Sequence, residues 1–107
     1  MGNLPTQVIG QAGTTINFSN ASAGGDTCAT GEDVKLLIKN GAVSSITATI
    51  ATPGKVDGDL DIQDRVVTVA AGATEGVRVT DRYRDPATGL ASIAWSSATS
   101  VTAAVIR

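Results

Sequence analysis

The clearest pattern in the chain is an alternation of apolar and polar residues that begins near residue 34 and recurs to the C-terminus. In VKLLIKN (34–40), Val34, Leu36 and Ile38 alternate with Lys35 and Lys39. This two-residue period is typical of a half-buried β-strand. The same kind of pattern predicts further strands, which we place at 15–18, 45–52, 65–70, 76–83, 90–97 and 100–107.

Turn residues separate these segments. Asn40-Gly41, Pro53-Gly54, Ala71-Gly72 and DPATG (85–89) each stand between two predicted strands, and such residues favour tight turns. No segment carries the 3.6-residue apolar stripe of a helix over more than a turn. The sequence therefore predicts an all-β fold: an antiparallel β-sandwich of about seven strands, with jelly-roll or immunoglobulin-like Greek-key topology.

Residues 1–31 differ from the rest because they are rich in Gly, Ala, Ser, Thr and Asn. Apart from TINF (15–18), they show little strand character, and SNASAGGDTCATG (19–31) is the least patterned stretch. We expect a flexible N-terminal arm and loop over 1–31 and a β-sandwich domain over 32–107. Within the first, we expect residues 1–13 to form an extended arm and 19–31 to be either a long loop or a segment that a partner orders.

Composition changes this picture in one respect. The 107 residues include one Phe, one Tyr and one Trp, so Val, Ile, Leu and Ala must fill the core. Each of these side chains buries little area, and burial contributes about 25 cal/mol per Å². We therefore expect neighbouring subunits to add stability, as in a homo-oligomer.

Charge and reactive residues exclude several classes of function. The net charge is −2 and the eight Lys and Arg are scattered, whereas nucleic-acid binding needs clustered cations. The chain has no His, which removes Ser–His–Asp triads and His-ligated zinc. We expect the single Cys28 to be an inert small side chain rather than a nucleophile. These observations predict no enzyme and no cofactor.

No apolar run approaches the roughly 20 residues that span a bilayer, and the first residues lack a signal-peptide pattern.

The acidic stretch DGDLDIQD (57–64) resembles the start of a calcium loop, because Asp57, Asp59 and Asp61 alternate. An EF-hand loop beginning at Asp57 would need Gly and Glu at the sixth and twelfth positions, which hold Ile62 and Thr68. We therefore predict a solvated inter-strand loop with no metal. Sugar-cleaving chemistry by these carboxylates is not expected either, since no aromatic platform is near.

Residues 31–107 resemble a family of small proteins of tailed bacteriophages and prophages, the capsid decoration or minor head proteins. The resemblance lies in an ordered series of weak motifs: IKNG (38–41), SSITATI (44–50), DGDL (57–60), DRVVTVAAG (64–72), DRYRD (81–85), GLASIAWS (89–96) and TSVTAAVIR (99–107). Two features depart from it. Residues 1–31 match nothing in the family, and ATEGVRVTD follows Gly72 where the family has a Pro-containing stretch.

The resemblance implies a non-enzymatic virion structural protein that binds the major capsid protein on the outside of the shell, often as a trimer. It would be made in the cytoplasm of the bacterial host and would end on the capsid exterior. The alternative is a carbohydrate- or receptor-binding β-sandwich on a virion or cell surface, which would require exposed aromatic side chains.

Five residues are candidates for an interface. Trp95 is expected either to fill the core or to anchor a subunit contact. Tyr83 is expected to cover the end of the sandwich or to touch the capsid, and Arg82 and Arg84 flank it, either solvated or paired with acidic groups of the shell. Phe18 lies in the N-terminal segment. Lys35 and Lys39 are expected to protect an exposed strand edge.

Overall fold

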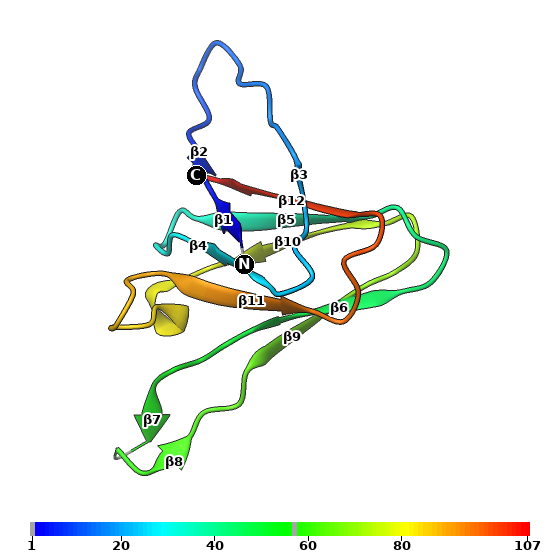
Figure 1. Cartoon of the computed structure of the whole chain (residues 1–107). Coiled ribbons are helices and arrows are strands. Elements are labelled where there is room, and N and C mark those ends of the chain that lie inside the picture. Colours follow the sequence, from blue (N-terminus) through cyan, green and yellow to red (C-terminus); the bar gives the residue numbers. More distant parts are fainter. Residues whose placement is uncertain (1, 57) are drawn as a thin grey trace.

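The computed structural model describes residues 2–56 and 58–107, and it is built from two five-stranded β-sheets that lie face to face (Figure 1). In the first sheet the strands follow the order β1 (Gly2–Leu4), β4 (Asp26–Cys28), β11 (Ala91–Trp95), β6 (Ile46–Ile50) and β9 (Arg65–Val69). In the second the order is β10 (Thr74–Arg78), β5 (Lys35–Asn40), β12 (Val101–Ile106) and β2 (Thr6–Gln7), with β3 (Ser19–Asn20) also paired to β12.

The apolar members of each alternating strand form one shared core. Leu36 and Ile38 of β5 face Ile46, Ala48 and Ile50 of β6 across the interior, and all five are buried. Val101, Ala103 and Val105 of β12 join them, so that aliphatic side chains dominate the core as the composition requires. The all-β prediction is therefore confirmed, and the core lies between the two sheets.

Two details of the sheets differ from the expected antiparallel arrangement of about seven strands. Both sheets are mixed, because β1 pairs parallel to β4 and β2 pairs parallel to β12. The strand count is also higher, because short strands accompany the predicted long ones. A further pair, β7 (Lys55–Val56) and β8 (Leu60–Asp61), forms a small antiparallel hairpin between β6 and β9.

The N-terminal segment differs most from its expected form. We expected an arm and loop over 1–31, but β1 and β4 belong to the first sheet, and Leu4 and Cys28 lie in the core. The four strands of this segment, β1 to β4, are too short and too polar to show an alternating pattern. Three of them form because their backbones pair with long strands that the pattern does reveal: β4 pairs with β11, and β2 and β3 pair with β12.

The strand predicted over 76–83 is shifted. β10 ends at Arg78, and Asp81–Tyr83 forms a single 3-10 turn. The strand begins earlier because Thr74 and Glu75 pair with Lys39 and Ile38 of β5. The strand expected over 15–18 is replaced by β3, which begins at Ser19.

Two segments project from opposite ends of the molecule (Figure 1). One is the 8–18 loop, which connects β2 to β3. The other is the β7–β8 projection, residues 53–64, of which all but residue 57 are described. With these extensions the molecule measures 41 × 35 × 20 Å along its principal axes.

Candidate interaction surfaces

Tyr83 and Arg82 lie on the 3-10 turn that follows β10, and Arg84 comes directly after that turn. The Tyr83 ring is buried, and its phenol oxygen accepts a hydrogen bond of 3.4 Å from Nε of Arg65 at the start of β9. This bond raises the pKa of the Arg65 guanidinium. Arg82 and Arg84 are exposed. The structure therefore gives Tyr83 a covering role at the sandwich end and leaves the two arginines at the surface.

Trp95 lies at the end of β11, half-buried against the core. Its indole Nε1 donates a hydrogen bond of 2.7 Å to Oδ2 of Asp26, a carboxylate that is itself buried. The backbone N–H of Ser22 donates to the same oxygen at 3.0 Å. Trp95 thus satisfies a buried polar group as well as filling space, which limits its use as a free anchor.

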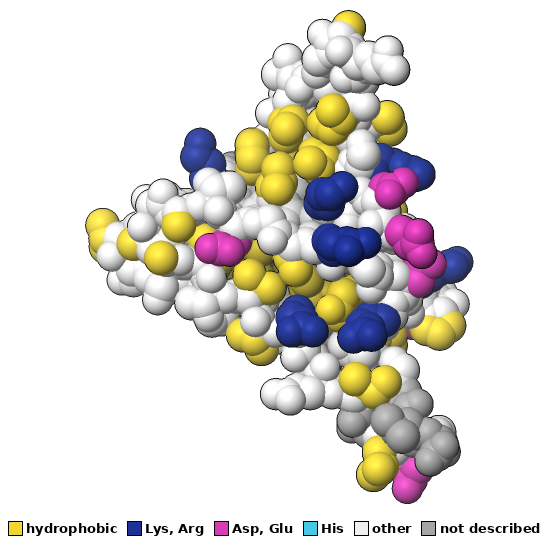
Figure 2. Space-filling view, turned by 180° about the vertical axis from the view of Figure 1, so that it is seen from behind, with side chains coloured by type: hydrophobic (Ala, Val, Ile, Leu, Met, Phe, Trp, Pro, Cys, Tyr) yellow, Lys and Arg dark blue, Asp and Glu magenta, His cyan; other side chains and the backbone are white. Residues whose placement is uncertain are grey.

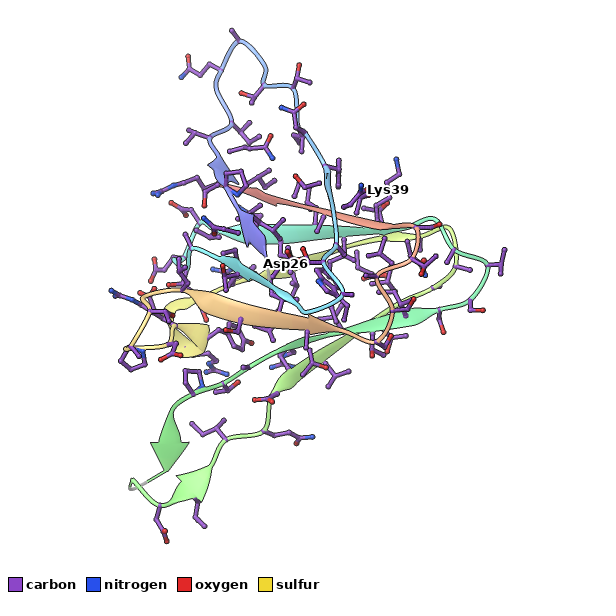
Figure 3. All side chains as sticks on the ribbon, in the orientation of Figure 1. Asp26 and Lys39 are labelled. Atoms are coloured by element: carbon purple, nitrogen blue, oxygen red, sulfur yellow. The ribbon has the colours of Figure 1, made fainter. Side chains whose placement is uncertain are left out.

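Phe18 lies where the 8–18 loop returns to the second sheet. Its side chain is 37 % exposed, and Nζ of Lys39 lies 5.8 Å from the ring centroid, a cation–π distance. Figure 3 shows Lys39 beside β12 and Asp26 near the middle of the molecule. Phe18, Tyr83 and Trp95 contact three different partners, Lys39, Arg65 and Asp26, so the candidates do not form one cluster.

Lys35 and Lys39 do not protect a strand edge, contrary to our expectation. They belong to β5, which lies between β10 and β12 inside the second sheet. Their side chains lie on its outer face, where Lys35 stands opposite Arg78 of β10. Lys35 donates to the carbonyl of Asp33 and Arg78 to the carbonyl of Glu32. Figure 2 shows Lys and Arg side chains gathered down the middle of one face, between two hydrophobic areas.

Exposed apolar side chains concentrate on the two projections. Seven large hydrophobic residues are exposed among those whose side chains the structure describes, and five of them belong to the projections: Val8, Ile9 and Phe18 on the 8–18 loop, and Leu60 and Ile62 on the β7–β8 projection. The other two are Val43, in the β5–β6 turn, and Val66, on β9. Clustered apolar surface of this kind marks interaction sites.

The 8–18 loop has a defined base. Gln7 donates from its amide to the carbonyl of Asn17 at 2.9 Å and accepts from the Asn17 N–H at 2.8 Å. Within the loop, Thr14 Oγ1 donates to the carbonyl of Val8 and accepts from the N–H of Gly10. These bonds fix where Val8 and Ile9 are presented, which lowers the entropy cost of binding through them.

The acidic stretch falls on the β7–β8 projection. Asp59 is exposed, and Asp64 Oδ1 accepts a hydrogen bond of 2.8 Å from the N–H of Thr52. Asp57 lies outside the described residues. Among those that are described, no group of three or more His, Cys, Asp or Glu could hold a metal ion. An open hollow of about 380 Å³ lies beside this segment, lined by Gln63, Asp64, Arg65 and Val66.

Cys28 is fully buried in β4, and burial raises the pKa of its thiol to about 11. The thiolate, which is the reactive form, is therefore suppressed at neutral pH, in keeping with an inert structural side chain. Within the described part of the chain, no helix is long and apolar enough to cross a membrane.

Sequence reasoning missed two buried polar residues. Asp26 lies in a Gly- and Ser-rich stretch that carries no strand pattern. Asn40 signalled only a turn, yet its side-chain nitrogen donates to the carbonyls of Ser44, Val69 and Ala70.

Comparisons with protein-family models, with curated proteins and with solved structures found no match.

Proposed function

We propose that the protein is a non-enzymatic virion structural protein, which decorates a bacteriophage capsid by binding the outside of the major capsid protein shell. The observation that carries this proposal is the placement of exposed apolar residues on two projections at opposite ends of a thin molecule (Figure 1). A protein that presents apolar contacts at both ends can bridge two neighbouring subunits of a lattice.

The energetics favour such a use. Val8 is 67 % exposed and Leu60 is 63 % exposed, so a partner that covers them removes apolar surface from water. Burial contributes about 25 cal/mol per Å² of apolar area. The Lys and Arg side chains between the two projections would then meet acidic groups of the shell. Such charge pairs orient the bound protein more than they raise its affinity. The family resemblance implies a trimer on the shell, but the proposed function does not depend on that oligomeric state.

The alternative, a carbohydrate- or receptor-binding module, receives less support. Stacking on sugars uses exposed aromatic faces, but the Tyr83 ring is buried and the Trp95 indole is bonded to Asp26. Phe18 is the exposed aromatic, and Lys39 lies over its ring.

Co-sedimentation with shells assembled from the major capsid protein of the same phage or prophage tests the proposal. Ile9→Asp and Ile62→Asp each place a charge on one projection, and we expect each to weaken binding at least tenfold, because a carboxylate must be desolvated in the contact. Val43→Asp is the matched control, since Val43 is 98 % exposed but lies on neither projection. Equal binding by all three variants, or none by the unmodified protein, would refute the proposal.

A further inference from the structure

The outer edge of β9 offers a free row of backbone hydrogen-bonding groups. Among the described strands, β9 pairs only with β6, and its register places Val67 opposite Ala48. On β6, Thr47 and Ala51 bond to the opposite neighbour, β11, through Ser96 and Ser92. Because adjacent residues of a strand point their backbone groups to opposite sides, Ile46, Ala48 and Ile50 are the β6 residues that bond to β9.

It follows that Val69, Val67 and Arg65 of β9 face β6, whereas the N–H and C=O groups of Val66 and Thr68 point away from the sheet. The Val66 side chain is 55 % exposed beside them. An unpaired strand of this kind is a ready template for another strand.

The other sheet edges in the described part of the chain are better protected against strand addition than the edge at β9. β1, β2 and β3 are two or three residues long, and short edge strands pair poorly. β10 is as long as β9 but has Gly76 at its centre. It also has Glu75, which stands opposite the buried Ile38 and so puts a charge on the inner face. Inward charges at an edge discourage strand addition, and Gly weakens a strand. β9, with the sequence RVVTV, has no glycine, and its one charged residue, Arg65, lies at the first position of the strand, where its guanidinium bonds to Tyr83.

We propose that β9 pairs antiparallel with β9 of a second copy of this chain, about a two-fold axis at Val67. In that register Val66 of each copy stands opposite Thr68 of the other. Both residues present free N–H and C=O groups, so the two pairs form four hydrogen bonds, and the first sheets of the two copies join into one.

The same register also avoids a clash of charges. Arg65 stands opposite Val69 of the second copy, so no like charges meet across the ladder. Such a contact is isologous, with the same patch used by both copies. It is two-fold, so it differs from the trimer that the family resemblance implies, and it does not depend on the capsid function.

Light scattering and sedimentation equilibrium of the whole protein over a range of concentrations test the proposal. Thr68→Pro removes an N–H that β6 does not use, at an edge position that tolerates proline. Thr74→Pro is the matched control, because Thr74 is an exposed threonine whose N–H points away from β5 at the protected edge. We expect a dimer whose dissociation constant rises about tenfold or more for Thr68→Pro and is unchanged for Thr74→Pro.

A second pair, Thr68→Lys and Thr74→Lys, repeats the comparison without altering the backbone, and circular dichroism checks that each variant folds. Hydrogen exchange gives an independent measurement: the Val66 and Thr68 amides should become protected as the concentration rises. A monomer at all concentrations, a trimer, or a dimer that Thr68→Pro leaves intact would overturn the proposal. So would protection of these amides only when the capsid protein is added, which would identify the shell as the occupant of the edge.

Discussion

Buried polar residues hold separate segments of the chain together inside this small core. Asp26 is buried because Trp95 and the backbone of Ser22 together satisfy one of its oxygens. A Cβ at residue 2 would lie 2.5 Å from the other oxygen, Oδ1, so glycine is required there. None of this could be predicted from the sequence, because the three segments are far apart in the chain and a lone Asp in a Gly-rich stretch is typical of a solvated turn.

Cys28 provides a prediction of pH dependence. Its pKa is about 11 in the folded protein against 9.0 ordinarily, because burial disfavours the thiolate. Between these values the folded chain holds a proton that the unfolded chain has released, so stability falls as pH rises. We expect a loss of about 2 to 3 kcal/mol between pH 8 and 11.

Urea unfolding across this range measures the loss, with Cys28→Ala as the control. The variant keeps all other titrating groups, so the difference between the two pH profiles isolates the thiol. If the two profiles run parallel, Cys28 makes no such contribution.

The strands divide into those the sequence reveals and those that only tertiary pairing creates. β5, β6, β9, β11 and β12 were predicted to within one or two residues at most ends, because each buries one face and alternation records that burial. β1 to β4 were not, because strands of two or three residues with polar side chains carry no period. Likewise, Lys35 and Lys39 correctly indicated an exposed face, but a pattern along one strand does not reveal its neighbours, so the expected edge was wrong.

Asn40 connects elements of both sheets and gives a prediction at this scale. From the end of β5 its side chain donates to carbonyls of the β5–β6 turn and of the end of β9, and its Oδ1 accepts the N–H of Ala42 at 3.0 Å. Asn40→Ala leaves these groups without partners, and we expect a loss of about 2 to 4 kcal/mol in the free energy of unfolding.

Asn20→Ala is the matched control for this measurement, since Asn20 is exposed on β3. Its effect should stay within about 0.5 kcal/mol in the same urea titration. Comparable effects from both variants would show that the Asn40 contacts add nothing beyond an ordinary surface position.

At the scale of the whole molecule, the fold is a thin plate with an apolar projection at each end and cations on one face between them (Figure 2). The aliphatic core and the positions of most long strands along the chain follow from the sequence. The projections do not, because exposed apolar residues such as Val8 and Leu60 look like ordinary loop or strand residues until the fold shows that nothing covers them.

The most direct test of the proposed function is cryo-electron microscopy of shells of the major capsid protein with the purified protein added. The account predicts extra density on the outer surface, with the 8–18 loop and the β7–β8 projection each seated on a capsid subunit. Shells that show no added density, or protein bound with both projections directed into solvent, would contradict it.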